Sequence, residues 1–124
     1  MTDSRPLVSV VDDDESVRES LPDLLRELGY SVQAFASAED FLASEHVTST
    51  RCLILDVTMP GMSGPELRRE LVQSGRQMPV IFITAHADAT LRPALLEQGA
   101  IECLFKPFTE EELVAALKAA FSDT

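Results

Sequence analysis

The chain alternates short apolar runs with longer segments whose apolar residues recur at helical spacing. Runs of four to eight apolar and β-branched residues predict strands, and recurrence every three or four residues predicts amphipathic helices. The run at 51–55 is almost wholly apolar, which is typical of a parallel strand buried on both faces. The predicted strands are 7–11, 31–35, 51–55, 79–83 and 102–105; the predicted helices are about 16–28, 38–44, 65–73, 87–98 and 110–121.

Local signals define several helix ends and two interruptions. Gly29 and Gly99 follow the last apolar position of two helices, where glycine commonly ends a helix. Thr109 with an acid three residues later forms a capping-box pattern at the start of the last helix. Pro22 and Pro93 lie inside helical patterns and should kink those helices or shift their starts, because proline lacks the backbone N–H.

Five strand–helix repeats with short loops predict an α/β fold, a parallel five-stranded sheet with helices on both faces. Right-handed crossovers leave few topologies, and five repeats favour the flavodoxin-like (βα)5 order 2-1-3-4-5. We expect one domain over residues 1–124, with its core at about 7–121 and no second domain within this chain.

Composition narrows the possible partners. Acidic residues outnumber basic ones 21 to 10, for a net charge of −11. Nucleic-acid affinity depends largely on Lys and Arg contacts to phosphates, so direct nucleic-acid binding is not expected. The excess acid suits a metal site, a basic partner surface or simple solubility.

Neither the terminal and apolar segments nor the two cysteines indicate a further function. No apolar run reaches the roughly 20 residues of a membrane span, and the first residues do not resemble a signal peptide, so we expect no membrane association and a cytoplasmic location. Cys52 and Cys103 lie in predicted interior strands without a CxxC pattern. They are expected to be buried free thiols.

Polar residues follow four of the five predicted strands. In open α/β sheets ligands bind at the carboxyl ends of the strands, near the point where the strand order reverses. These side chains should therefore meet at one edge of the sheet. They are Asp12, Asp13 and Asp14 after the first strand, Asp56 after the third, Thr84 after the fourth and Lys106 after the fifth.

Such an arrangement suits phosphoryl transfer. Clustered carboxylates repel one another unless a cation lies between them, and Mg²⁺ prefers carboxylate, water and phosphate oxygens. With the metal bound, one carboxylate can attack phosphorus and form an acyl phosphate. Lys106 could neutralise a phosphoryl oxygen, and the Thr84 hydroxyl could donate a hydrogen bond to another.

Four segments together resemble the motifs of response-regulator receiver domains from two-component signalling. They are residues 10–18, 55–64, 84–86 and 105–108, in the family's order and spacing. The resemblance extends over about residues 7–121 and is strongest to the FixJ group. It implies a CheY-like receiver domain that catalyses only its own phosphorylation and dephosphorylation and is otherwise no enzyme.

The resemblance also implies roles for the acidic residues. Asp56 would be the phosphoacceptor. Asp13 and Asp56 would bind Mg²⁺ directly, together with the backbone carbonyl of Thr58, and Asp12 would act through a water molecule. Mn²⁺ would be able to substitute for Mg²⁺.

The resemblance further implies how the phosphoryl group is held and sensed. Thr84 and Lys106 would contact it, and the Lys106–Pro107 peptide bond would be cis. Phosphorylation would then rearrange the surface formed by helix 87–98, strand 102–105 and helix 110–121. Cys103 occupies the position where an aromatic residue usually takes part in this change, so the aromatic step is absent from the expected mechanism.

Two further positions, Thr58 and His86, lie two residues beyond Asp56 and Thr84. In the family such positions tune the lifetime of the acyl phosphate; otherwise they are ordinary loop residues, and the sequence leaves both options open. The implied partners are a cognate histidine kinase, a second copy in a phosphorylation-dependent homodimer, and a C-terminal DNA-binding domain outside this chain.

Other functions remain as alternatives. Asp12-x-Asp14 also resembles the motif of haloacid-dehalogenase-type phosphohydrolases, in which Asp12 would be the nucleophile, but the paired acids expected after the fourth strand are replaced by Thr84, Ala85 and His86. A pseudo-receiver would bind partners constitutively without phosphorylation. A flavin-binding module is disfavoured because the acidic loop would repel a phosphate.

Overall fold

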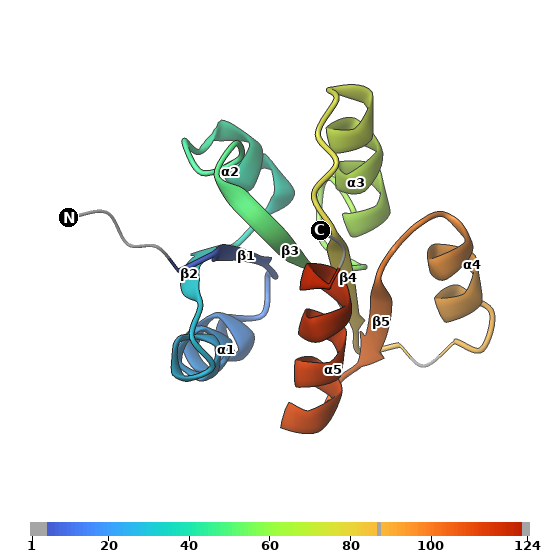
Figure 1. Cartoon of the computed structure of the whole chain (residues 1–124). Coiled ribbons are helices and arrows are strands. Elements are labelled where there is room, and N and C mark those ends of the chain that lie inside the picture. The colour runs from blue at the N-terminus through green and yellow to red at the C-terminus, as the bar shows by residue number, and fades with distance from the viewer. Residues whose placement is uncertain (1–4, 87, 123–124) are drawn as a thin grey trace.

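The computed structural model describes residues 5–86 and 88–122, in which five parallel strands form one sheet of order β2-β1-β3-β4-β5. Helices cover both faces of this sheet (Figure 1). The flavodoxin-like order predicted from the sequence is confirmed. The elements are β1 Leu7–Val11, α1 Glu15–Glu27, β2 Ser31–Phe35, α2 Ala38–Ala43, β3 Thr50–Asp56, α3 Gly64–Gln73, β4 Val80–Thr84, α4 Leu91–Glu97, β5 Glu102–Phe105 and α5 Glu110–Phe121.

The core has two parts, one on each face of the sheet. On one face α1 and α5 pack on the strands through leucines such as Leu25 and Leu117. On the other face α2, α3 and α4 pack through Phe41, Leu67 and Leu95. Because both faces are covered, the residues of β3 and β4 are almost all buried, as expected for central parallel strands.

The fourth helix begins later than the sequence pattern suggested. We predicted a helix over 87–98, whereas α4 spans Leu91–Glu97, and Ala87 lies outside the described residues. The Asp88 carboxylate accepts hydrogen bonds from the backbone N–H and the hydroxyl of Thr90, at 2.9 and 2.8 Å, which makes a turn instead of a helix. Pro93 therefore falls in the first turn of α4, where its missing N–H has no partner to lose.

Pro22, by contrast, lies well inside α1, which runs through it without ending. It is one of the buried residues of α1, together with Leu21 and Leu25. Proline cannot donate to the carbonyl four residues before it, so α1 gives up one backbone hydrogen bond at this position. The shifted helix start that we considered for this proline does not occur.

Two strong caps hold the helices that follow the site loops. Ser63 accepts a hydrogen bond from the N–H of Glu66, whose side chain accepts from the N–H of Ser63. Thr109 and Glu112 form the same reciprocal pair at the start of α5. The capping box predicted for the last helix is confirmed. Such caps are worth about 1 kcal/mol each.

Both cysteines are buried free thiols, as predicted. Burial raises the pKa of the Cys52 thiol to about 12 and also raises the pKa of Cys103. Neither thiol is therefore a thiolate near neutral pH. Within residues 5–86 and 88–122, no helix has the length and apolar character needed to cross a membrane.

Candidate functional site

The candidate site lies at the carboxyl ends of four adjacent strands. Asp56 is the last residue of β3 and Thr84 the last of β4, while Asp12 and Lys106 come directly after β1 and β5. In the β3–β4 pairing Asp56 lies opposite Ile83, so Thr84 is only one residue further along the neighbouring strand. The parallel topology therefore brings together side chains that are far apart in the sequence.

Three carboxylates form the centre of this site. Asp12, Asp13 and Asp56 each present an oxygen within 4.8 Å of the others. Asp12 is fully buried and Asp56 is 6% exposed, whereas Asp13 is exposed to solvent. Carboxylates this close together, two of them shielded from water, repel one another strongly unless a positive charge is nearby.

Lys106 supplies one positive charge to the cluster. Its Nζ lies 2.8 Å from Oδ2 of Asp12 and 3.9 Å from Oδ2 of Asp56. The first contact is an ion pair by distance, and Oδ2 of Asp12 has no hydrogen-bond partner within residues 5–86 and 88–122. One ammonium thus faces two buried carboxylates and leaves part of their charge uncompensated.

The electrostatic consequence appears at Asp56. Burial raises the pKa of its carboxyl to about 7, the charge of Asp12 adds to the rise, and Lys106 partly opposes it. A carboxyl with this pKa is half protonated near neutral pH in the metal-free protein. A divalent cation would favour the charged form, and the all-oxygen donor set of Asp12, Asp13 and Asp56 fits a hard ion such as Mg²⁺.

Backbone and side-chain contacts fix Asp12. Its N–H donates to the carbonyl of Phe35 at 3.1 Å, and its Oδ1 accepts from the N–H of Asp14 at 2.9 Å. The guanidinium of Arg18 donates to the Asp12 carbonyl at 2.9 Å. Asp14 itself caps α1 through Ser16, and these hydrogen bonds lower the pKa of its carboxyl. Asp14 therefore acts at the helix start, as expected for an acid outside the cluster.

The loop after Asp56 folds back against the strand that it leaves. The N–H of Gly64 donates to the carbonyl of Val57 at 3.0 Å, and a Cβ on Gly64 would overlap the Asp56 carbonyl oxygen. From α2, the carboxylate of Glu39 accepts from the N–H of Met62 at 3.0 Å. Glycine is needed at 64 because no side chain fits this close approach.

Thr84 and Lys106 are linked through the backbone. Thr84 is fully buried, its Oγ1 accepts from the N–H of His86 at 3.1 Å, and its carbonyl accepts from the N–H of Lys106 at 2.7 Å. The Lys106–Pro107 peptide bond is cis, as the family resemblance implies. His86 and Thr58 are exposed, which is consistent with either a tuning role or an ordinary loop position.

The structure thus places Asp12, Asp13, Asp56 and Lys106 in one cluster, with Thr84 on the adjacent strand end. Cys103 is buried on β5, three residues before Lys106, in the part of the apolar core that includes Leu95 of α4.

Sequence reasoning missed three residues that hold the site in place: Arg18, Glu39 and Gly64. Their contacts join residues 6, 23 and 8 positions apart, between Arg18 and Asp12, Glu39 and Met62, and Gly64 and Asp56. The available signals were weak. Arg18 and Gly64 lie inside two of the motif segments, but nothing in the sequence indicates that Glu39 reaches the loop after β3.

A family model described as the response regulator receiver domain matches residues 8–118. The chain belongs to this family. As a receiver domain of a two-component response regulator, it is similar to the response regulator protein TodT of Pseudomonas putida, with 42% identity over 97% of this chain and 53% of TodT. The transcriptional regulatory protein FixJ of Azorhizobium caulinodans is also 42% identical, over 97% of this chain and 56% of FixJ. The receiver domain thus spans about half the length of these curated relatives.

Solved structures agree with this assignment. The response regulator StyR matches with a TM-score of 0.86 and 44% identity, over 96% of this receiver domain and 60% of the StyR chain. The FixJ-N crystal structure matches with a TM-score of 0.84 and 36% identity, over 100% of this receiver domain and 98% of that chain. The resemblance to the FixJ group seen in the sequence is confirmed.

Proposed function

We propose that this receiver domain is a cytoplasmic switch that is activated by phosphorylation of Asp56. The observation that carries the proposal is the convergence of three carboxylates and Lys106 at one rim of the sheet, with Asp56 buried at its centre. Family membership supports the same chemistry. The expected donor is a phosphohistidine of a cognate histidine kinase.

The acidic residues would bind the metal and accept the phosphoryl group. Asp13, Asp56 and the Thr58 carbonyl would hold Mg²⁺, with Asp12 acting through water, and Mn²⁺ would substitute. When bound, the metal neutralises the phosphoryl oxygens and favours the ionised nucleophile. An oxygen of Asp56 attacks phosphorus, the P–N bond of the phosphohistidine breaks, and the imidazole leaves with the electron pair and takes up a proton.

Lys106 and Thr84 would then respond to the added charge. The Lys106 ammonium, already within 3.9 Å of Asp56, can pair with a phosphoryl oxygen. The Thr84 hydroxyl uses its oxygen to accept from the N–H of His86, so its proton is available for a phosphoryl oxygen. Lys106 compensates charge and Thr84 senses the new group.

An apolar groove of about 500 Å³ beside Lys106 is the proposed docking site of the kinase. It lies between α1 and the turn after β5 and is lined by Val17, Leu21, Leu24 and Phe108 among others. An apolar surface adjoining a reactive group is what a protein donor needs in order to bring its phosphohistidine to Asp56.

Output would pass through α4, β5 and α5. Leu95 is the one buried side chain of α4, whereas α5 buries four, so α4 is anchored more loosely than α5. A groove of about 380 Å³ between these elements is lined by Cys103, Arg92 and Ala119 among others. We propose that phosphorylation shifts α4 without an aromatic rotamer change and thereby controls a homodimer or an output domain, with transcription as the regulated process.

The decisive experiment is the intact mass of the protein after incubation with acetyl phosphate, with and without Mg²⁺. We expect one added phosphoryl group that requires Mg²⁺, is absent from Asp56→Asn and persists in Asp14→Asn, the matched exposed acid of the neighbouring loop. An adduct that survives in Asp56→Asn and disappears in Asp12→Asn would support the phosphohydrolase alternative. No adduct even with a panel of kinases would support a pseudo-receiver.

A further inference from the structure

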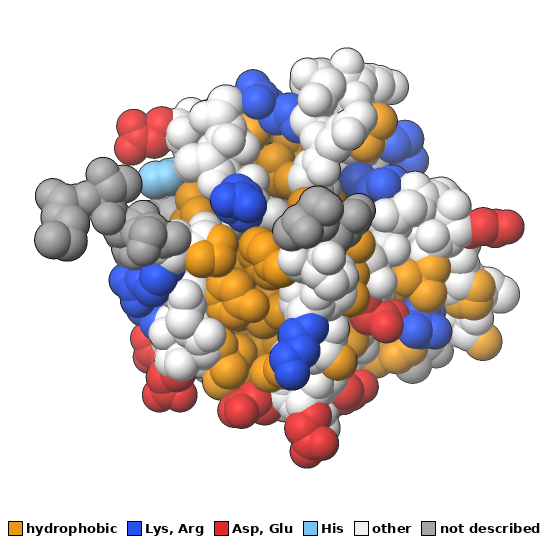
Figure 2. Space-filling model, in the orientation of Figure 1, with side chains coloured by type: hydrophobic (Ala, Val, Ile, Leu, Met, Phe, Trp, Pro, Cys, Tyr) orange, Lys and Arg blue, Asp and Glu red, His pale blue; other side chains and the backbone are white. Residues whose placement is uncertain are grey.

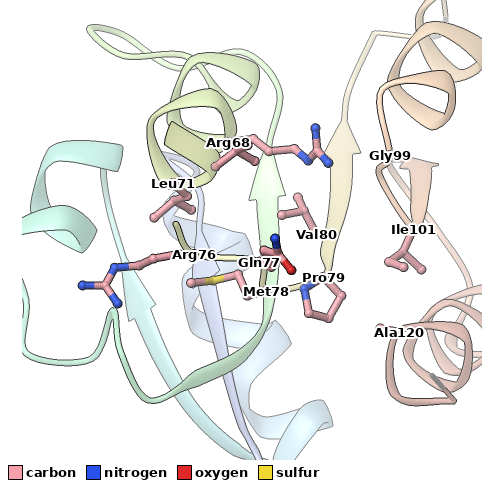
Figure 3. Close-up of a pocket in the computed structure, with 11 residues that line it drawn as sticks. Arg68, Leu71, Arg76, Gln77, Met78, Pro79, Val80, Gly99, Ile101 and Ala120 are labelled. Atoms are coloured by element: carbon pink, nitrogen blue, oxygen red, sulfur yellow. The ribbon is translucent and has the colours of Figure 1, made fainter. Parts of the chain in front are cut away.

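A third groove, shown in Figure 3, lies where β4 begins, at the opposite end of that strand from Thr84. It has a volume of about 310 Å³ and lies between α3, the turn before β5 and the last turn of α5. Val80 begins β4 at this groove, three residues before the position that pairs with Asp56, so roughly 10 Å of strand separates the two sites. We call it the α3–α5 groove; its lining includes Arg68, Leu71, Val72, Met78, Ile101 and Ala120.

The floor of the α3–α5 groove is apolar and accessible. Val72 is 52% exposed, and no other large apolar side chain in the described part of the chain is exposed. A single exposed valine is unremarkable on its own. Here it adjoins Met78 and Ile101 in a concave surface, which gives an incoming apolar side chain several partners at once.

The rim of the groove is basic, although the protein is strongly acidic. Among the residues that the structure describes, Arg68 and Arg76 line it and no acidic residue does, in a chain with 21 acidic and 10 basic residues. The adjoining hollow, which shares Arg76, adds Arg51 and again has no acidic residue from the described part of the chain. On the face drawn in Figure 2, some basic side chains lie near α3 and others elsewhere, and many of the acidic ones lie along the lower edge.

Within the described part of the chain, the two arginines have no carboxylate partner and so can pair with a ligand. In Figure 3 Arg68 extends from α3 towards Gly99, and Arg76 extends in the opposite direction. The Arg68 guanidinium would lie 2.7 Å from a Cβ on Gly99, so the glycine leaves space for it. Within residues 5–86 and 88–122, neither guanidinium has a carboxylate at ion-pair distance, whereas Arg26, Arg92 and Lys106 do.

We propose that the α3–α5 groove docks an acidic peptide segment of a partner protein. A large apolar side chain of the segment would pack on Val72, Met78 and Ile101, and flanking carboxylates would pair with Arg68 and Arg76. Charge complementarity favours this occupant, because among the described residues the charged side chains that line the groove are those of Arg68 and Arg76. The surface lies away from Asp56, so the proposal does not depend on the proposed phosphorylation.

Peptide display tests this proposal. A random peptide library on phage would be selected in parallel against wild type, Arg68→Glu, Arg76→Glu, Val72→Asp and Arg69→Glu. Arg69 is the matched control, because it is exposed on the same helix outside the groove and its substitution changes the net charge equally. Far-UV circular dichroism of each variant shows that it is folded.

We expect wild type and Arg69→Glu to enrich the same peptides, with Asp or Glu beside Leu, Ile or Phe. Synthetic copies should bind Arg68→Glu and Val72→Asp at least tenfold more weakly than wild type, and more weakly at high salt. No enrichment, enrichment that is equal on Arg68→Glu, or peptides without carboxylates would overturn the proposal. A labelled random-sequence DNA duplex that binds in an Arg68-dependent manner, without acidic-peptide enrichment, would instead identify a nucleic-acid site.

Discussion

At the scale of single residues, the site contains more negative than positive charge, and burial makes the resulting repulsion strong. Asp12 and Asp56 are almost fully buried and share one ammonium, that of Lys106. In water the same groups would be well solvated and only weakly coupled. Because the buried carboxylates carry more negative charge than Lys106 neutralises, a cation should bind favourably near Asp56. This suits a carboxylate that must bind a metal before it reacts.

This imbalance predicts a pH dependence for the metal-free protein. The pKa of Asp56 is about 7 in the folded state, against an ordinary value of 3.8 for an aspartate. Between these values the folded state holds a proton that the unfolded state has lost, so stability falls as the pH rises from about 4 to 7. Asp56→Asn should remove this loss and stabilise the protein at pH 8 by on the order of 4 kcal/mol.

The measurement is urea denaturation at pH 5 and pH 8 in the presence of a chelator. Asp14→Asn serves as the control, because Asp14 is exposed and the hydrogen bonds of its helix cap lower its pKa. Equal stability of wild type and Asp56→Asn at pH 8 would contradict the electrostatic account of the site.

At the scale of elements, α4 is the most weakly anchored helix that covers the sheet near β5. It has seven residues, and Thr90 at its start makes no side-chain cap. Arg92 connects it to β5 by an ion pair of 2.7 Å with Glu102, whose carboxylate also accepts from the N–H of Cys103. The contact joins the helix to the strand that carries Cys103.

Removal of this ion pair should loosen α4. Arg92→Ala is expected to cost about 0.5–1 kcal/mol, because the pair is partly exposed, and to speed amide exchange in α4. Hydrogen–deuterium exchange with mass spectrometry measures both the site and the size of the effect. Arg26→Ala, which breaks an exposed ion pair within α1, should leave exchange in α4 unchanged. Slower or unaltered exchange of α4 in Arg92→Ala would exclude this role.

At the scale of the whole molecule, a ligand that binds only the folded state stabilises it by mass action. Saturating Mg²⁺ should therefore raise the Tm of the wild-type protein by several degrees, since 100 times the Kd corresponds to about 2.7 kcal/mol. Asp13→Asn should lose most of this increase, because Asp13 is the accessible member of the carboxylate cluster. Thermal denaturation with and without Mg²⁺ measures the effect.

Asp23→Asn removes an exposed acid from the middle of α1 and serves as the control. It should keep the full rise in Tm with Mg²⁺, which would exclude a general effect of charge. If Mg²⁺ raised the Tm of Asp13→Asn as much as that of wild type, the metal would not bind at this cluster.

Most of the fold followed from local sequence patterns. Strand order, helix number and the residues at each strand end could be predicted, because periodicity, short loops and crossover handedness leave few arrangements. The start of α4 could not, since the Asp88 turn competes with the first helical turn and a helical pattern does not show which is more stable. The helical pattern also does not show whether a proline ends a helix: Pro22 lies inside α1, which continues through it.

The sequence by itself determined the chemistry: which carboxylates, which ammonium and which hydroxyl end the strands, and therefore what kind of ion and group they suit. Tertiary structure alone decided the distances, the burial that raises the pKa of Asp56, and the supports from Arg18, Glu39 and Gly64. Among the described residues, it also decided that Arg68 and Arg76 line the α3–α5 groove beside apolar side chains. The physical reason is that residue type and period act locally along the chain, whereas burial and charge coupling depend on which segments the fold brings together.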